Sequence, residues 1–174
     1  MVEGLGGSKV DVRLKYNYTH APYYLQDQLQ SQNKQVAGVD FNFISNFSSN
    51  VEIVLNSNSS MHWSESGLRK NRYFEEMAEL TLRTDIIPKI RFTSVVNYSY
   101  KHSYDIQNEE PTTIFLRASL SRELGEKGEI SLDGYNLLNV KNSNSLSLKP
   151  EYLIYRSRYS PGRYFLLTYA LKIK

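Results

Sequence analysis

Residues 9–18 read Lys-Val-Asp-Val-Arg-Leu-Lys-Tyr-Asn-Tyr, with apolar and polar side chains in strict alternation. Side chains two positions apart share a face in a β-strand but spiral around a helix, so this stretch predicts an amphipathic strand. The same period recurs at 37–43, 51–55, 75–83, 90–101, 113–120, 129–133 and 165–173. The sequence therefore predicts an all-β protein with about eight strands.

The connections between these segments alternate between short and long. Short turns are expected at 46–50, 85–88 and 124–128, and long polar loops around 31–33, 57–60, 108–111 and 142–147. In an up-and-down antiparallel sheet, alternate connections lie at the same end, and transmembrane barrels have short turns at one end and long loops at the other. We therefore predict an antiparallel up-and-down transmembrane β-barrel over residues 1–174, with 20–34 and 140–160 as exposed outer loops.

Composition excludes several other classes of protein. With 21 Lys and Arg against 18 Asp and Glu, the net charge of +3 is too small to suggest a nucleic-acid partner. The absence of cysteine excludes disulfides, a thiol nucleophile and a zinc–thiolate site. No apolar run approaches the roughly 20 residues of a transmembrane helix, and no signal peptide is visible.

Charged residues are concentrated on one face of the predicted strands. Glu76 is the one charge expected on the apolar face, near a strand end where its cost in lipid is small. The predicted lumen-facing charges are Arg13, Lys15, Asp40, Glu75, Glu79, Arg83, Arg91, Lys101, Arg117, Glu129 and Asp133. With Lys9, Asp11 and Glu52 they balance in sign, which suits an ion-paired or water-filled lumen.

Tyrosine is abundant, at 14 of 174 residues. Tyr and Trp rings favour membrane–water interfaces, because one side of that zone is apolar and the other is wet. An aromatic girdle is therefore predicted at Tyr16, Tyr18, Phe74, Tyr98, Tyr100 and Phe165. The alternative is that aromatic residues simply suit exposed strands.

The C-terminal region carries two longer motifs. They are Ile-Ser-Leu-Asp-Gly-Tyr-Asn-Leu-Leu-Asn at 130–139 and Pro-Gly-Arg-Tyr-Phe-Leu-Leu-Thr-Tyr-Ala-Leu-Lys-Ile-Lys at 161–174. They resemble the last two strands of TonB-dependent receptors and of the Bacteroidetes outer-membrane β-barrel family. Within the first motif, Gly134 marks either a bulge, after which Tyr135 and Leu137 continue the apolar face, or the end of the strand.

The resemblance implies an outer-membrane location and a parent protein that imports a nutrient, such as a chelated metal or a glycan. It also implies the barrel-assembly machinery and TonB as partners, although no plug domain or TonB-contacting box is visible in the sequence. Receptors of this family have about 22 strands, so the chain resembles the last eight. It departs from them at Ile173 and Lys174, where an aromatic residue usually stands.

No catalytic, metal or cofactor site is predicted. His20, His62 and His102 all fall in or beside expected loops, where scattered surface histidines are the simpler interpretation than a metal site. Glu75 and Glu79 share a face but lie roughly 13 Å apart along a strand, too far to act as a catalytic pair. Ion pairing in the lumen is the expected role for both.

Two alternatives to a receptor segment remain open from the sequence. One is a self-contained eight-stranded outer-membrane barrel with a structural or binding role, and the other is a soluble eight-stranded barrel that binds an apolar ligand. A membrane barrel is apolar outside and a soluble one is apolar inside, which alternation alone does not distinguish. We expect strands 9–18 and 163–173 to hydrogen-bond to each other and close the barrel, because an open edge in lipid leaves backbone groups unsatisfied.

Overall fold

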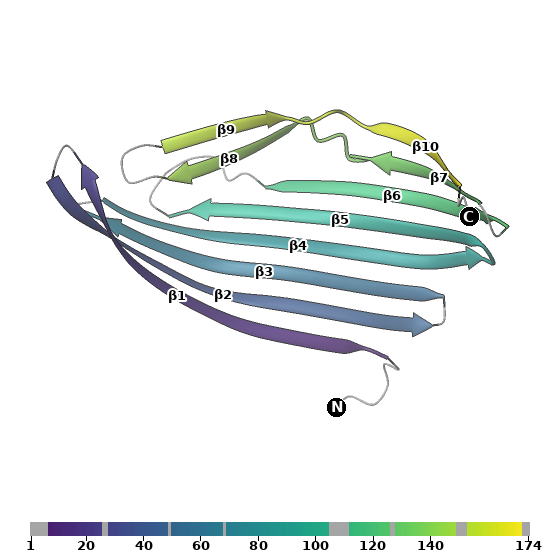
Figure 1. Ribbon diagram of the computed structural model, residues 1–174, viewed down its shortest axis with the longest axis horizontal. Helices are drawn as coiled ribbons and strands as arrows, with labels where there is room; N and C mark the ends of the chain where they lie inside the picture. The colour runs from purple at the N-terminus through teal and green to yellow at the C-terminus, as the bar shows by residue number, and fades with distance from the viewer. Residues whose placement is uncertain are drawn as a thin grey trace.

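The computed structural model describes residues 7–25, 28–48, 50–67, 69–104, 112–125, 128–148 and 153–171, and confirms the all-β prediction. Eight strands form one antiparallel sheet in the order β1-β2-β3-β4-β5-β6-β7-β10, and β8 and β9 form a separate pair (Figure 1). The bounds are β1 Lys9–Leu25, β2 Gln28–Ser48, β3 Val51–Ser66, β4 Arg69–Ile87, β5 Ile90–Ser103, β6 Thr113–Leu124, β7 Gly128–Tyr135, β8 Asn142–Leu148, β9 Leu153–Tyr159 and β10 Tyr164–Leu171.

The short turns lie where the sequence predicts them, but three of the four expected long loops, at 31–33, 57–60 and 142–147, are strands. β1 and β2 stay paired as far as Leu25 and Gln28, so the described residues of the expected 20–34 loop belong to strands. Likewise Ser57–Ser60 pairs with both β2 and β4. In these segments the backbone pairing continues although most side chains on both faces are polar. Polar side chains can hydrogen-bond to one another across neighbouring strands. Tyr18 Oη donates to Asn33 Oδ1 over 3.2 Å in the extended hairpin.

The sheet is not closed, so the expectation that its first and last strands pair is wrong. β1 and β10 are the two edges of the sheet and lie on opposite sides in Figure 1. The register also staggers the two edges along the strand direction. The row of paired residues through Phe165 crosses the sheet to Ser45, whose hydroxyl bonds Ser8, just before β1 begins. β10 therefore lies beyond the start of β1 along the strand direction.

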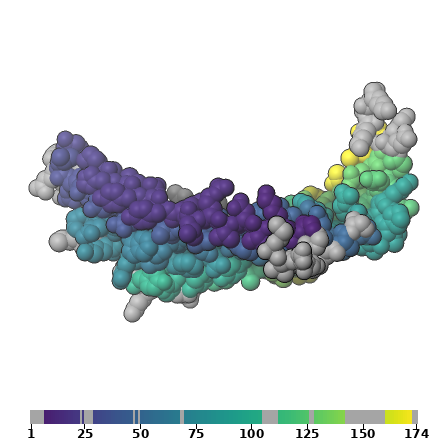
Figure 2. All heavy atoms as spheres, turned by 90° about the horizontal axis from the view of Figure 1, so that it is seen from below, coloured from purple at the N-terminus to yellow at the C-terminus, as the bar shows by residue number. Residues whose placement is uncertain are grey.

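The cross-strand register divides the sheet into two faces. The apolar face carries Val10, Val12, Leu14, Phe41, Phe43, Leu55, Leu80, Val96, Leu116, Leu120, Leu132, Phe165 and Leu167. The polar face carries the residues between these positions. The molecule is bent, with the β10 end turned away from the rest (Figure 2). Glu76 lies on the apolar face between Ser59 and Tyr100, as the sequence predicts.

β7 ends at Tyr135, directly after Gly134, and the following residues form a tight turn. The strand thus ends one residue past Gly134, although the Leu137 amide still donates to the Leu116 carbonyl of β6 over 2.9 Å. A Cβ on Gly134 would lie 2.9 Å from Leu137 Cδ2 and 3.0 Å from Phe165 Cε1, so a larger residue would displace both side chains. Glycine thus lets Leu137 and Phe165 cover the end of the strand.

The Asn136 side chain holds the base of the β8–β9 hairpin. Its Nδ2 donates to the carbonyls of Val140, at 2.7 Å, and Pro161, at 2.8 Å, and its Oδ1 accepts from the Val140 amide at 2.9 Å. Asn136 is 8% exposed and has a φ of 49°, a left-handed conformation that asparagine tolerates better than most residues. The strands of this hairpin, which continue β7 and β10 in Figure 1, lie within the exposed outer loop expected over 140–160.

Candidate functional site

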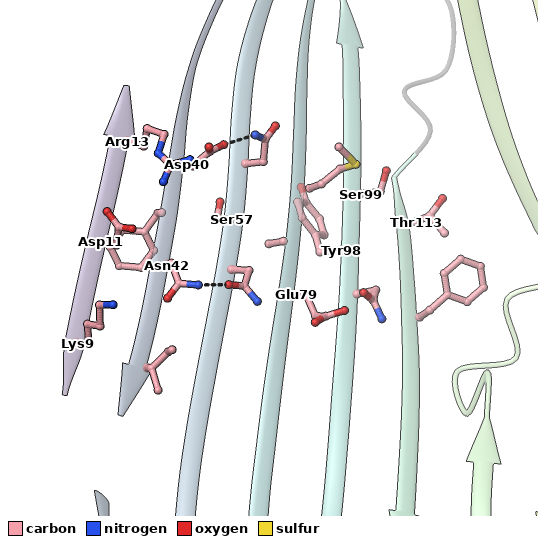
Figure 3. Close-up of a pocket in the computed structure, with 18 residues that line it drawn as sticks. Lys9, Asp11, Arg13, Asp40, Asn42, Ser57, Glu79, Tyr98, Ser99 and Thr113 are labelled. Atoms are coloured by element: carbon pink, nitrogen blue, oxygen red, sulfur yellow. Dashed lines mark hydrogen bonds between the residues drawn. The ribbon is translucent and has the colours of Figure 1, made fainter. Parts of the chain in front are cut away.

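An open trough of about 1020 Å³ lies on the polar face. Most of its lining residues occupy polar-face positions on six adjacent strands, from β1 to β6. They include Lys9, Asp11, Arg13, Asp40, Asn42, Asn56, Asn58, Glu79, Asn97, Ser99 and Thr113 (Figure 3). The polar face of the sheet is therefore the hollowed one.

One row of paired residues runs across the middle of the trough. It passes from Asp11 through Asn42, Asn56, Glu79 and Asn97. Asn42 Nδ2 donates to Asn56 Oδ1 within this row. Neighbouring strands lie roughly 4.8 Å apart, so such a row presents a regular ladder of amide and carboxylate groups. This ladder can bind polar ligands or water.

The register places all eleven charges predicted to face a lumen on this polar face. Three of them, Arg13, Asp40 and Glu79, line the trough itself. Asp40 forms an ion pair with Lys15 and accepts a hydrogen bond from Asn58. The other eight lie on the same face but do not line the trough: Lys15, Glu75, Arg83, Arg91, Lys101, Arg117, Glu129 and Asp133.

Ion pairing on the polar face is local. Arg83 Nη1 lies 2.6 Å from Glu52 Oε2, and Arg91 Nε lies 3.0 Å from Asp85 Oδ1 beside the β4–β5 turn. Glu75 Oε2 lies 3.9 Å from His62 Nε2, whereas no ion pair to Glu79 occurs among the described residues. Exposed pairs of this kind contribute little stability, about 0–1 kcal/mol each.

A compact cluster lies on the polar face toward the end of the sheet with the β3–β4 hairpin. The His62 ring stacks on Tyr73 at 4.3 Å, and Lys101 Nζ lies 4.2 Å from the Tyr73 ring centre. His62 Nε2 lies 2.9 Å from Ser60 Oγ and 3.9 Å from Glu75 Oε2. Because both partners face the same ring nitrogen, the Ser-His-Glu group lacks the arrangement of a catalytic triad.

All three histidines lie on strands, and His102, the second-last residue of β5, lies beside the connection to β6 as expected. His62 occupies the polar face and His102 the apolar face, so they cannot share a ligand. His20 Nδ1 lies 2.7 Å from Asn33 Oδ1 in the β1–β2 hairpin. Within the described ranges of the chain, no group of three or more potential metal ligands exists.

All six aromatic residues predicted for a girdle lie on the apolar face. Phe74 and Tyr100 pack with ring centres 6.3 Å apart. Sequence reasoning missed Trp63, which lies on the same face between Gln35 and Arg72. The serines at 57, 59, 64 and 66 blur the apolar–polar alternation around Trp63, although Trp and Tyr are the residue types typical of such a girdle.

The aromatic residues follow an oblique line across the sheet. Trp63 lies in the row of Tyr18 and Phe74 in the row of Tyr16, Tyr98 lies in the row of Val12, and Phe165 lies at the level of Ser8. Between β1 and β10, which are seven strand spacings apart, the position of the aromatic residues therefore shifts along the strand direction by ten residues, from the level of Tyr18 to that of Ser8. At roughly 3.3 Å per residue and 4.8 Å per spacing, this is an angle of about 45° to the rows.

The apolar face is uncovered. Val95 is the single buried apolar side chain in the described part of the protein, whereas Leu14 is 78% and Leu167 is 73% exposed. A single sheet of this kind has no hydrophobic core of its own. In the part of the chain that the structure describes, no helix is long and apolar enough to cross a membrane.

Comparison with known proteins gives no further assignment: no protein-family model, no curated protein and no solved structure matches the chain.

Proposed function

We propose that the chain forms eight strands of the wall of an outer-membrane β-barrel, with its apolar face on lipid and its trough in the lumen. On the motifs at 130–139 and 161–174, the barrel resembles the C-terminal part of a TonB-dependent receptor. Its role would then be passage of a nutrient, such as a chelated metal or a glycan, across the outer membrane.

The observation that carries this proposal is the distribution of polarity over the curved sheet. Amide and charged side chains line the hollow together with several apolar ones, while the opposite face exposes many large apolar side chains, among them Leu14, Tyr16 and Leu167. Contiguous apolar patches larger than a few hundred Å² are rare on soluble monomers and mark contact with a protein or a membrane. A membrane barrel has this polarity, with lipid outside and water inside.

The oblique aromatic line supports the same proposal. Barrel strands tilt by about 35–45° from the barrel axis, and transmembrane barrels carry aromatic girdles at a constant depth in the membrane. A girdle of constant depth must therefore cross tilted strands obliquely. The angle of about 45° across β1 to β10 agrees with that tilt.

The separated edges favour a barrel with more strands than these eight. Open edges do not occur in the hydrocarbon region of a membrane, because their N–H and C=O groups would lack partners. In a larger barrel both β1 and β10 would pair with further strands. This argues against the self-contained eight-stranded barrel, and the polar hollow argues against a soluble barrel that holds an apolar ligand.

The proposal predicts which end of the sheet faces outward. The chain has no cysteine, so the variants Lys70→Cys, at the start of β4, and Pro88→Cys, in the β4–β5 turn, each carry a single thiol. Both positions are exposed. In intact cells, a maleimide on a polymer too large to cross the membrane should label the Lys70→Cys variant alone, since the long hairpins face outward.

Both variants should react fully once detergent dissolves the membrane, which controls for thiol reactivity. Labelling of the Pro88→Cys variant, but not of Lys70→Cys, in intact cells would reverse the orientation. Labelling of both in intact cells would contradict insertion across a membrane.

A further inference from the structure

Glu79 is an isolated carboxylate at the centre of the trough. Its cross-strand neighbours are Asn56 and Asn97, and the nearest residues on its own side of β4 are Met77 and Thr81. The diagonal neighbours on β3 and β5 are Val54, Asn58, Val95 and Ser99. All are uncharged, and Figure 3 shows the carboxylate directed over the trough.

The opposite side of the trough carries excess positive charge. Lys9 and Arg13 flank Asp11 on the same face of β1, and Asp40, which lies opposite Arg13 and interacts with it electrostatically, is ion-paired with Lys15. Three positive charges therefore stand against two negative ones on this side. In the described ranges, neither Lys9 nor Arg13 has an ion-pair partner within 4 Å. The trough therefore has a positive side at β1 and a negative side at β4.

Neutral amides lie between the two sides. Asn42 and Asn56 occupy the positions between Asp11 and Glu79, one on each intervening strand. Three strand spacings separate β1 from β4, which is about 14 Å. An extended peptide covers roughly 3.5 Å per residue, so about four residues reach from one side to the other.

From this arrangement we infer that the trough binds a short zwitterionic peptide, extended across the strands from β4 to β1. Its terminal ammonium pairs with Glu79 and its terminal carboxylate with Lys9 and Arg13, while side-chain amides of Asn42 and Asn56 bond its peptide groups. A volume of about 1020 Å³ is ample for such a ligand. A neutral sugar would use the amides but leave both charged sides without partners.

This inference rests on the proposed function, since it treats the trough as part of a lumen through which a solute passes. Binding is measured by isothermal titration calorimetry on the full chain in detergent micelles, with strand content checked by circular dichroism. The probes are tetraalanine, N-acetyl-tetraalanine, tetraalanine amide and, as the neutral alternative, maltotetraose.

The variants are Glu79→Gln, the double variant Lys9→Gln/Arg13→Gln, and Glu129→Gln as a matched control. Glu129 lies on the same face but outside the trough. Glu79→Gln should weaken tetraalanine binding about tenfold or more and leave N-acetyl-tetraalanine unaffected, because the acetyl group removes the charge that Glu79 recognises. The double variant should have the same effect on tetraalanine, but none on tetraalanine amide.

The inference would be overturned if tetraalanine does not bind, if Glu129→Gln weakens it as much as Glu79→Gln does, or if maltotetraose binds more tightly than tetraalanine. The membrane proposal is tested separately by Trp63 fluorescence in lipid vesicles. A chain that inserts but does not bind tetraalanine refutes the peptide ligand alone, and a chain that does not insert refutes the membrane barrel.

Discussion

Replacing Leu116 by arginine is expected to make folding into a bilayer less favourable by about 2–4 kcal/mol, the cost of Arg on the lipid face near the midplane. Leu116 lies on the apolar face of β6, in the row that joins Val96, Leu80, Leu55, Phe43 and Val10. The equilibrium constant for folding would fall by a factor of roughly 30 to 700. Urea titration in lipid vesicles measures it.

Ser119→Arg is the matched control, because Ser119 lies on the polar face of the same strand. It pairs in register with Thr93 and Asp133, so a new arginine would meet water and a carboxylate. We expect a change within about 0.5 kcal/mol, as for most surface substitutions. Equal destabilisation by the two arginines would contradict the assignment of the faces.

Loss of the Asn136 side chain is expected to release the base of the β8–β9 hairpin. Asn136→Ala removes the two donors to Val140 and Pro161 and the acceptor for the Val140 amide. An unsatisfied buried group costs about 1–3 kcal/mol, and alanine is also strained at a φ of 49°. We expect a total loss of about 2–4 kcal/mol in the free energy of unfolding, and faster hydrogen exchange at the Val140 amide.

Two further variants separate the causes. Asn136→Gly relieves the backbone strain but not the lost hydrogen bonds, so it should recover only part of the stability. Asn17→Ala, at an exposed position on the edge strand β1, should leave the hairpin unchanged. If Asn136→Gly restores the slow exchange of the Val140 amide, the hydrogen bonds of the Asn136 side chain do not hold the hairpin.

Side-chain alternation predicted the strands because the two faces of this sheet meet different surroundings along most of its length. Alternation holds throughout 9–18 and, apart from Ser94 and Val95, over 90–101, and both segments are strands in the structure. Where both faces are polar, as at 28–34, the pattern vanishes although pairing continues. This is why the strands are longer than the sequence suggests and the loops shorter.

Closure of the sheet could not be predicted, since it depends on register and curvature instead of on any residue pattern. β1 and β10 are both regular and amphipathic, which makes their pairing plausible from the sequence. Their offset along the strand direction emerges only when the registers of seven successive pairs are added. The oblique line of aromatic residues likewise emerges only from the combined register of all eight strands.

The candidate site was predicted in part. The face of each of the eleven predicted lumen charges followed from alternation, but the isolation of Glu79 did not, because it depends on neighbours contributed by β3 and β5. The structural role of Asn136 was also invisible from the sequence. The motif at 130–139 indicates a resemblance to a family, but it does not reveal the hydrogen bonds that Asn136 makes.

The most direct test of the membrane proposal uses the single tryptophan of the chain. Trp63 is 36% exposed on the apolar face, at the end of the aromatic line, so its indole should lie at the membrane–water interface. In vesicles, its emission should shift to the blue, and lipids brominated near the headgroup should quench it more than lipids brominated near the chain end. Emission at the wavelength of water-exposed indole, with no quenching by either lipid, would contradict a membrane-spanning barrel wall.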